Sequence, residues 1–435
     1  MKRRTFCRIR YLYTQRDMES AARSNAHLDR ARWMALWAAM LGFMLDAMDV
    51  LLYSFALQSI RQEFSLSNEQ AGLVFTYTLV ASAFGGIISG LACDRFGRQR
   101  TLIFTILLYS LASGGSATAG SLPELLFWRA LVGLGLGAEW SAGAVLVAEY
   151  WPSEKRARAV SLMQSGWAIG YILAALVSAT VLPAYGWRAM FLVGVLPALL
   201  TVWIRRNVAE PPVWQERQGK AGSFADIFKG PLLKITLIST ALATTVLFAY
   251  WGVFTWLPGF LAAPIDKGGA GFGIVKTSGW IIAMQVGAFF GYNCFGLLAD
   301  WLGRRKAFAL YVTAAAVMTI AYGSAPRWAG ESASTVLLLS GPLLGFFGTG
   351  FFSLFGTMLA ELYPTAIRGA GQGFVYNFGR GLSALAPLTV GAVADKSGLG
   401  VALVLNAGYF LLGAVLVFFL PETKGKELSN SATAS

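Results

Sequence analysis

The sequence predicts an all-α integral membrane protein in which twelve transmembrane helices form two pseudo-symmetric six-helix bundles. Three observations support this prediction. Hydrophobic residues make up 56% of the 435 residues and charged residues only 13%, whereas a soluble domain usually carries about a quarter charged residues. Twelve stretches are long and apolar enough to cross a bilayer, and two short motifs each occur once in either half of the chain.

The twelve apolar stretches are about as long as a helix must be to cross the hydrocarbon core, roughly 20 residues. Helix is expected because lipid offers the backbone no hydrogen-bond partners. The predicted spans are 33–58, 70–92, 101–120, 124–148, 159–183, 189–204, 235–262, 277–299, 307–325, 334–360, 370–394 and 401–420. The predicted parts are a basic cytoplasmic tail (1–32), an N-terminal six-helix bundle (33–204), a cytoplasmic linker (205–234), a C-terminal six-helix bundle (235–420) and a cytoplasmic tail (421–435).

The basic residues predict how the chain is oriented in the membrane. Of the 35 Lys and Arg residues, 27 lie in the two tails and the even-numbered connections, and six lie in the odd-numbered connections. Because connections rich in Lys and Arg stay on the cytoplasmic side, we expect a multi-pass protein of the plasma (inner) membrane with both termini in the cytoplasm. The net charge of +13 is mostly this signal, so we expect lipid and not nucleic acid as the partner.

The first 32 residues lack the 7–15-residue apolar core of a signal peptide. The segment 1–16 is rich in Arg and free of acidic residues, so a transit peptide remains an alternative. A poorly ordered cytoplasmic tail is the main expectation.

Few residues in the chain could carry enzymatic chemistry. Cys7, Cys93 and Cys294 are far apart, and His27 is the only histidine. This distribution provides neither a disulfide framework nor the ligand spacing of a zinc site. No nucleophile–base pair is evident either. We therefore expect no cofactor, no metal and no enzymatic activity.

Two motifs recur in the same order in both halves. Gly90–Arg98 has the pattern Gly-x-x-x-Asp-Arg-x-Gly-Arg, and Gly296–Arg304 repeats it 206 residues later with Trp in place of the first Arg. Glu149–Arg156 has the pattern Glu-x-x-Pro-x-x-x-Arg and returns 212 residues later at Glu361–Arg368. This recurrence predicts two parallel halves related by an axis along the membrane normal.

These residues resemble the major facilitator superfamily over about 33–425. Asp46-Ala-Met-Asp49 is similar to the Asp-x-x-Asp of the sialate/lactate and aromatic-acid proton symporters. Gly133–Trp140 resembles the sialate/lactate and metabolite:proton symporters, although Ala138 stands where the family usually has glycine. The chain is therefore most similar to the sialate/lactate-type organic acid:proton symporters.

The repeated loop charges are the candidate cytoplasmic gate. The resemblance implies that Asp94 bonds the N-terminal end of span eleven, where the helix dipole favours an anion, and that the charges of each half part when the transporter opens. Single exposed pairs contribute only ~0–1 kcal/mol, so a gate needs several. The alternative is that these charges only mark topology. The candidates are Asp94, Arg98, Glu149, Arg156, Asp300, Arg304, Glu361 and Arg368.

Charge at bilayer depth is the strongest functional signal. Only five charged residues lie at bilayer depth, five or more residues from either end of a predicted span: Asp46, Asp49, Arg129, Glu139 and Arg380. An Arg or Asp at the bilayer centre costs about 2.5–3.5 kcal/mol on translocon scales, so such residues usually face a cavity and pair. The alternative is that all five form structural ion pairs between helices.

These residues suggest a mechanism. Arg380 offers a planar fork that can hold a carboxylate with two bonds. A protein carboxylate in a dry cavity binds a proton more tightly than in water, and Asp46, Asp49 and Glu139 are the candidates for proton coupling. The substrate-binding candidates are Arg380, Asn377, Tyr376, Gln164 and Arg129. Most aromatic residues in the spans, such as Trp167, Tyr250 and Trp251, are expected to pack helices.

We expect a monomer that carries a small organic anion (a monocarboxylate, a sialate-like acid or an aromatic acid) together with protons by alternating access. A carrier of sugar or another neutral solute, or a proton-coupled exporter, is the alternative. The segment Pro421–Gly425 resembles the ending of sugar porters and favours it, whereas a neutral solute has no need of Arg380. A receptor with a transporter fold is less favoured, because only 15 residues follow Leu420.

Overall fold

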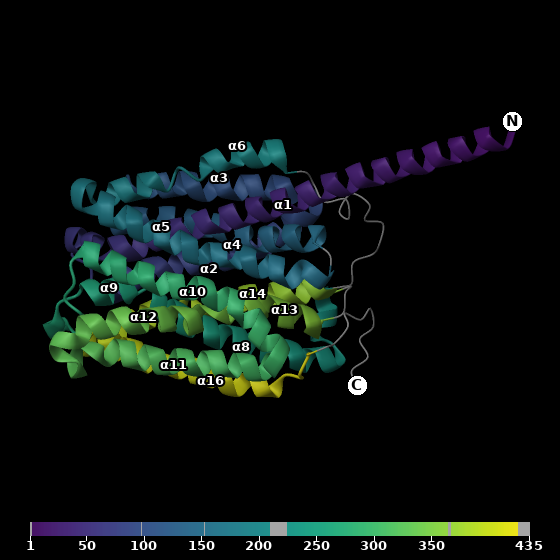
Figure 1. Ribbon diagram of the computed structural model, residues 1–435. Helices are drawn as coiled ribbons and strands as arrows, with labels where there is room; N and C mark the ends of the chain where they lie inside the picture. Colours follow the sequence, from purple (N-terminus) through teal and green to yellow (C-terminus); the bar gives the residue numbers. More distant parts are fainter. Residues whose placement is uncertain (1, 97, 152, 209–223, 364–366, 425–435) are drawn as a thin grey trace.

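The computed structural model describes residues 2–96, 98–151, 153–208, 224–363 and 367–424. Within these ranges the regular structure is helical (Figure 1). The first half contains α1 (Lys2–Phe64), α2 (Asn68–Phe96), α3 (Arg98–Ser116), α4 (Leu122–Tyr150), α5 (Ser153–Val193) and α6 (Ala198–Asn207). The second half contains α8 (Gly230–Phe254), α9 (Leu257–Ala262), α10 (Ile274–Leu302), α11 (Arg304–Trp328), α12 (Ala333–Gly350), α13 (Phe352–Leu362), α14 (Arg368–Ser383), α15 (Leu385–Ser397) and α16 (Leu399–Leu416). Short 3-10 helices are η1 (Phe224–Phe228), η2 (Ile265–Lys267), η3 (Gly330–Ser332) and η5 (Val417–Phe419).

The helices lie side by side, with the first half next to the second (Figure 1). The N-terminal helix and the exit of the chain beyond α16 lie at the same end of the bundle, which we call the termini end (Figure 1). The opposite end, where α9 lies, is the far end. Each connection between successive passes turns the chain back across the bundle (Figure 1).

In the described ranges the chain makes twelve passes, as the sequence predicts. Helix α5 contains the fifth pass and part of the sixth, because Gly186 has φ 76° and turns the chain back at the far end. Only glycine adopts that conformation readily, and a Cβ there would meet no other atom within 4 Å. The sixth pass then continues through α6.

Three passes of the second half are interrupted helices. They are the seventh (α8 and α9), the tenth (α12 and α13) and the eleventh (α14 and α15). Length and mean hydropathy alone select eight candidate spans among the described helices, with the fifth and sixth passes taken as one. The third, fourth and eleventh passes are not selected.

The N-terminal tail is helical and continuous with the first pass. Helix α1 begins at Lys2 and projects beyond the bundle before it becomes the first pass (Figure 1). Residues 2–32 contain neither Gly nor Pro, and those are the two residues that most disfavour a helix interior. The backbone therefore has no break between the tail and the first span.

The two halves meet along two pairs of passes, α5 with α10 and α2 with α14 and α15. Along the second pair, small residues allow the backbones to approach closely. A Cβ on Gly72 would lie 2.5 Å from the Pro387 carbonyl oxygen, and one on Gly381 would lie 3.3 Å from the Ala83 Cβ. At the far end the Trp256 Nε1–H donates to the carbonyl of Pro387 at 3.0 Å. The buried hydrophobic residues form one cluster that runs through both halves and across this interface.

Candidate functional site

Arg380 lies between the two halves, near the break in the eleventh pass. Helix α14 ends at Ser383, three residues after Arg380, and α15 resumes at Leu385. The Arg380 side chain is buried, and its guanidinium carbon lies 5.3 Å from the centre of the Tyr376 ring. Its Nε and Nη1 atoms have no hydrogen-bond partner among the described residues. The site therefore holds a buried cation with unused donors.

Two small cavities adjoin Arg380. The first, which we call the polar cavity, is lined by Asp46, Val50, Thr78, Leu79, Ser82, Leu136, Trp167, Trp251 and Arg380. The second, the aromatic cavity, is lined by Phe43, Gln164, Trp167, Leu247, Tyr250, Trp251, Tyr292, Phe352, Tyr376 and Arg380. Space that a water molecule can enter is about 10 Å³ in the polar cavity and about 20 Å³ in the aromatic cavity. Each has room for about one water, so the two halves must part to admit a larger molecule.

The polar cavity places a carboxylate beside Arg380. Asp46 is almost completely buried in α1, and its Oδ1 has no hydrogen-bond partner among the described residues. The hydroxyls of Thr78 and Ser82 donate to carbonyls of their own helix, at 3.0 and 2.8 Å. Asp46 and Arg380 are thus the two charged side chains that line this cavity. The structure thus brings these two candidate residues to one cavity.

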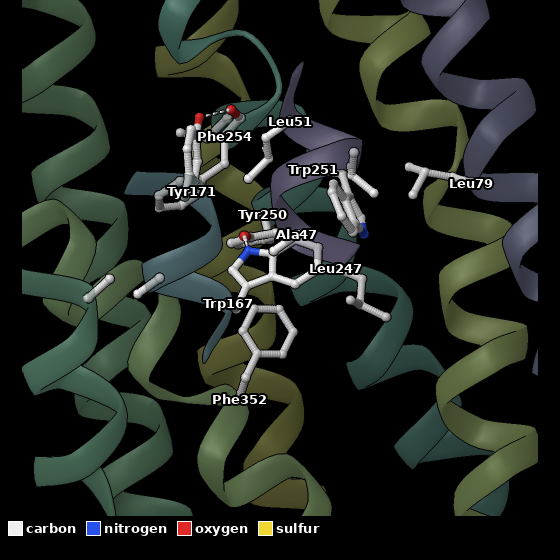
Figure 2. Close-up of a cluster of buried hydrophobic side chains, with 14 of the residues drawn as sticks. Ala47, Leu51, Leu79, Trp167, Tyr171, Leu247, Tyr250, Trp251, Phe254 and Phe352 are labelled. Carbon is white, nitrogen blue, oxygen red and sulfur yellow. Dashed lines mark hydrogen bonds between the residues drawn. The ribbon is translucent and has the colours of Figure 1, made fainter. Parts of the chain in front are cut away.

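The aromatic cavity is built by both halves. Trp167 of α5 donates from Nε1 to the hydroxyl of Tyr250 in α8 at 2.6 Å. The rings of Trp167 and Trp251 lie edge to face with centres 5.9 Å apart. Figure 2 shows these rings gathered with Phe352 at the junction of the halves. The predicted substrate-binding residues Gln164 and Tyr376 also line this cavity.

Asp49 and Arg129 form a separate buried cluster within the first half. Arg129 Nη1 lies 3.6 Å from Asp49 Oδ2, and both side chains are completely buried. Ser113 of α3 donates a hydrogen bond to Asp49 Oδ1. The guanidinium lies over the rings of Tyr53 and Phe191, 5.8 and 5.5 Å from their centres. The structure therefore pairs Arg129 with a protein carboxylate and does not place it among the residues that line the two cavities.

Glu139 lies inside the first half, against α1. A Cβ on Gly42 would come within 2.0 Å of Glu139 Oε1, so the side chain occupies the space that this glycine leaves. Gly42 and Asp46 are four residues apart, on the same face of α1. Both carboxylate oxygens of Glu139 are buried without a hydrogen-bond partner among the described residues. Glu139 thus lies about one helical turn from Asp46, toward the termini end.

Asn377 occupies the interface between the halves. A Cβ on Gly86 of α2 would lie 2.3 Å from Asn377 Oδ1, and Asn377 Nδ2 donates to the carbonyl of Gly373 at 3.0 Å. Asn377 does not appear among the residues that line the two described cavities. It lies one turn closer to the termini end than Arg380, and its contact in this arrangement is with α2.

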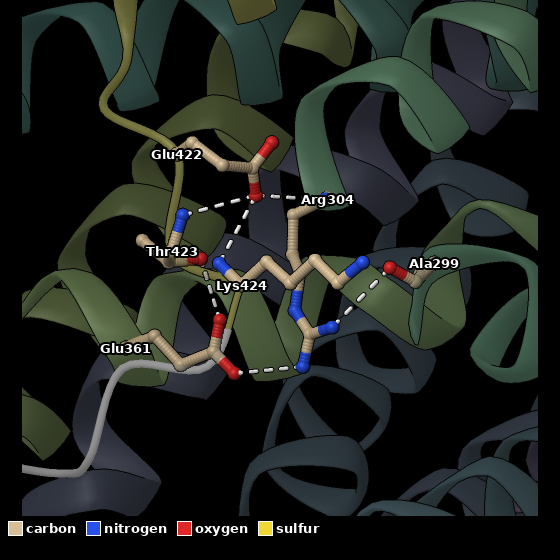
Figure 3. Close-up of polar contacts among 6 residues, drawn as sticks. All are labelled: Ala299, Arg304, Glu361, Glu422, Thr423 and Lys424. Atoms are coloured by element: carbon tan, nitrogen blue, oxygen red, sulfur yellow. Dashed lines mark hydrogen bonds and ion pairs between the residues drawn. The ribbon is translucent and has the colours of Figure 1, made fainter. Parts of the chain in front are cut away.

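Two of the predicted gate residues are paired in the described structure. Arg304 Nη2 lies 3.3 Å from Glu361 Oε1, and Thr423 Oγ1 donates to Glu361 Oε2 at 2.5 Å (Figure 3). Glu422 accepts the backbone N–H of Arg304 at 2.8 Å, so the segment after η5 is fastened to the start of α11 (Figure 3). The side chains of the remaining candidates lie outside the described part of the structure; these are Asp94, Arg98, Glu149, Arg156, Asp300 and Arg368.

Hydrogen bonds also set the charge of Glu422 at the termini end. Burial raises the pKa of this carboxyl, but the backbone N–H groups of Arg304, Arg305, Lys424 and Thr423 outweigh burial and hold the pKa below its ordinary value. Glu422 is therefore a carboxylate at neutral pH, at the N-terminal end of α11 where the helix dipole favours it.

Sequence reasoning did not single out the aromatic lining. Trp167, Tyr250 and Trp251 are three of many aromatic residues in the spans, and most such residues pack helices or lie at membrane interfaces. The hydropathy of these three residues does not show toward which neighbour their side chains point. Only the packing of α5 against the second half brings these three rings to one cavity.

The chain is similar to known transporters over most of its length. The Major Facilitator Superfamily model matches residues 39–326 and 270–434. The cis,cis-muconate transport protein of Acinetobacter baylyi is 33% identical over 402 residues, which cover 89% of this chain and 94% of that relative. The sialic acid transporter of Escherichia coli is 30% identical over 388 residues, which cover 88% of this chain and 93% of the relative.

The solved structures agree in fold. The crystal structure of a D-xylose–proton symporter matches 92% of this chain and 100% of its own, with a TM-score of 0.75 and 20% identity. At that identity the likeness speaks for the architecture alone. Membership of one family explains the twelve passes, the repeated motifs and the match to the family model over most of the chain. The chain is a membrane transporter and not an enzyme, and it belongs to the major facilitator superfamily.

Proposed function

We propose that this protein carries a small organic anion together with at least one proton, by alternating access. The observation that supports this most strongly is the buried Arg380, whose Nε and Nη1 lack partners among the described residues and which shares a cavity with the carboxylate of Asp46. A buried guanidinium needs an anion. Asp46 is one candidate anion, and a substrate carboxylate is the other.

Competition between these two anions couples the substrate to the proton. When a substrate carboxylate takes the fork of Arg380, Asp46 loses its counter-ion in a dry site. A carboxylate without a counter-ion in such a site binds a proton more tightly. Substrate and proton therefore load together, and hydration of the open site on the other side of the membrane releases both.

The two other buried carboxylates have distinct places in this scheme. Asp49 is paired with Arg129 in the first half and lies one turn from Asp46 on the same helix. Glu139 lies one turn from Asp46 on the other side, toward the termini end. The three carboxylates thus form a row through the first half, along which a proton could enter and leave while the substrate stays between the halves.

The relatives support this class of substrate. The names of three of them state a carboxylic acid as cargo, namely cis,cis-muconate, sialic acid and 3-(3-hydroxy-phenyl)propionate. The distribution of Lys and Arg favours the inner membrane and cytoplasmic termini. One chain carries both halves, so we propose a monomer.

Uptake into proteoliposomes tests the proposal. The purified protein is reconstituted, and uptake of labelled carboxylates and of xylose is measured with and without an imposed inward proton gradient. We expect gradient-driven accumulation of at least one carboxylate, abolished by a protonophore. Xylose uptake without carboxylate uptake would favour the neutral-solute carrier. Carboxylate uptake that does not depend on the proton gradient would show that transport is not coupled to protons.

A further inference from the structure

We propose that the aromatic cavity selects flat, conjugated carboxylates and that Trp167 and Trp251 are the residues that determine this specificity. The inference rests on the proposed function, since it takes Arg380 as the group that holds the carboxylate. It narrows the cargo from organic anions in general to acids with an aromatic ring or a planar unsaturated chain.

The first support is the composition of the cavity wall. Seven of its ten lining residues carry an aromatic ring, and Arg380 is the one charged side chain among the ten. The rings belong to both halves and meet mostly edge to face, with the ring centres of Trp167 and Trp251 5.9 Å apart and those of Tyr250 and Phe352 5.0 Å apart. Aromatic rings prefer such offset and edge-to-face contacts with further rings. A flat aromatic ligand can therefore make offset or edge-to-face contacts with several of these rings.

The second support is the position of three side chains at the boundary between the cavities. Trp167, Trp251 and Arg380 line both the polar and the aromatic cavity. A carboxylate held by Arg380 would therefore lie between the polar cavity, which Asp46 lines, and the aromatic cavity. Once the halves have parted to admit it, an acid of this kind extends from the fork of Arg380 into the aromatic cavity, with its flat body against Trp167 and Trp251.

The third support is an unused donor in the same wall. Trp251 is buried, and its Nε1–H has no hydrogen-bond partner among the described residues. Together with Nε and Nη1 of Arg380, it is one of three buried donor groups without a described partner that adjoin both cavities. An unpaired buried donor is costly. An acidic ligand offers the acceptors that these groups need.

The same wall disfavours a polyhydroxylated acid. The hydroxyl of Tyr250 already accepts the N–H of Trp167 at 2.6 Å. Most of the exposed wall is ring and aliphatic carbon, although Gln164, Tyr292 and Tyr376 also bring polar groups to it. Each buried substrate hydroxyl without a hydrogen-bond partner costs binding free energy. A mostly apolar wall should therefore bind a polyhydroxylated acid weakly.

A matched pair of ligands tests the inference. Benzoate and cyclohexanecarboxylate carry the same charge and are similar in size, but only benzoate is flat and aromatic. Binding of both to purified protein is measured by calorimetry, with N-acetylneuraminate as the polyhydroxylated acid. We expect benzoate to bind about tenfold more tightly than cyclohexanecarboxylate, as two ring contacts imply, and N-acetylneuraminate to bind more weakly than either.

Three variants assign the effect to the two indoles. Trp167→Leu and Trp251→Leu should each lower the benzoate preference several-fold. Trp251→Phe retains a ring but loses the donor, so it should retain the preference and weaken both acids together. Trp328→Leu removes an indole that is 60% exposed at the end of α11, and this control should change neither. Thermal stability of each variant shows that it is folded.

The outcomes separate the inference from the proposed function. Equal affinity for benzoate and cyclohexanecarboxylate, with both lost in Arg380→Ala, would overturn the aromatic selection and leave an organic-anion carrier. A benzoate preference that survives both Leu variants would also overturn it. If no acid binds and xylose does, the proposed function fails and the inference fails with it.

Discussion

Asp395, at the end of α15 in the second half, accepts two hydrogen bonds from Asn68 at the start of α2 in the first half. The Asn68 side-chain Nδ2 donates at 2.6 Å and its backbone N–H at 3.1 Å. The backbone N–H of Glu69 adds a third bond at 3.0 Å. An exposed carboxylate of one half thus caps the first turn of a helix of the other. This contact fastens the far end of the bundle.

Loss of this cap should favour opening of the far end. Because an N-cap contributes about 1 kcal/mol, Asp395→Ala should raise the open fraction about fivefold. Asp395→Asn, which still accepts a hydrogen bond, should have a smaller effect. The measurement is the rate at which an impermeant thiol reagent reaches a cysteine at Ser82, a residue of the polar cavity, in a background without the native cysteines.

The Asp395 prediction has a matched control. Asp266 lies in η2, also at the far end, and its replacement by Asn should leave labelling of the Ser82 cysteine unchanged. Equal labelling rates in Asp395→Ala and the parent, with normal thermal stability, would show that the cap does not hold the far end closed.

Neutral replacements at Asp46 and Asp49 should separate coupling from exchange. We expect Asp46→Asn to lose proton-driven accumulation and to retain counterflow, because the site still alternates but carries no proton. Asp49→Asn should lose accumulation as well if the proton passes through the Asp49–Arg129 pair. Both are measured in proteoliposomes at matched protein density. Full accumulation by both variants would exclude the two aspartates as proton carriers.

The pair of Asp49 and Arg129 should also contribute to stability. Removing one partner of a buried pair costs about 3–5 kcal/mol because the other charge remains buried alone. Arg129→Leu should therefore lower the melting temperature in detergent markedly. Adding Asp49→Leu to it should recover part of the loss, since no buried charge then remains. A double variant less stable than Arg129→Leu would contradict a simple paired-charge account.

Glu422 predicts a pH dependence at the termini end. Its pKa is held below the ordinary value of 4.5 by backbone N–H donors, so its carboxylate form stabilises the folded protein. That stabilisation is present above the ordinary pKa and is lost as the pH falls through the lower, folded-state pKa. Glu422→Gln should therefore be less stable than the parent at pH 7, and the difference should disappear in acid. Thermal melting from pH 7 to pH 3 measures it. If Glu422→Gln remains less stable than the parent at pH 3, altered packing and not the lost charge explains the lower stability.

The sequence predicts the fold well because lipid constrains it. Twelve apolar stretches, the Lys and Arg distribution and the repeated Asp and Glu motifs lead to the architecture without any tertiary information. Depth in the membrane puts Asp46, Glu139 and Arg380 in one layer and Asp49 and Arg129 in another. In the structure Asp46 and Arg380 line one cavity, and Arg129 lies 3.6 Å from Asp49. Depth alone does not show which helix face points into the half and which points between the halves.

The aromatic wall and the position of Asn377 depend on packing between the halves. Trp167 and Tyr250 are 83 residues apart and meet through one hydrogen bond. Asn377 meets Gly86 only because a glycine at that depth lets α2 approach. Nothing in the local pattern of any of these residues marks its partner, since both contacts join segments distant in sequence.

The measurement that tests the account most directly is carboxylate binding to purified Arg380→Ala protein, with thermal stability as the folding control. The account predicts a loss of affinity of about 100-fold or more, because the substrate carboxylate loses its buried counter-charge. Arg380→Lys, which keeps the charge without the fork, should lose less but still bind weakly. If folded Arg380→Ala binds and transports a carboxylate as the parent does, Arg380 is not the anion site, and the neutral-solute carrier becomes the better account.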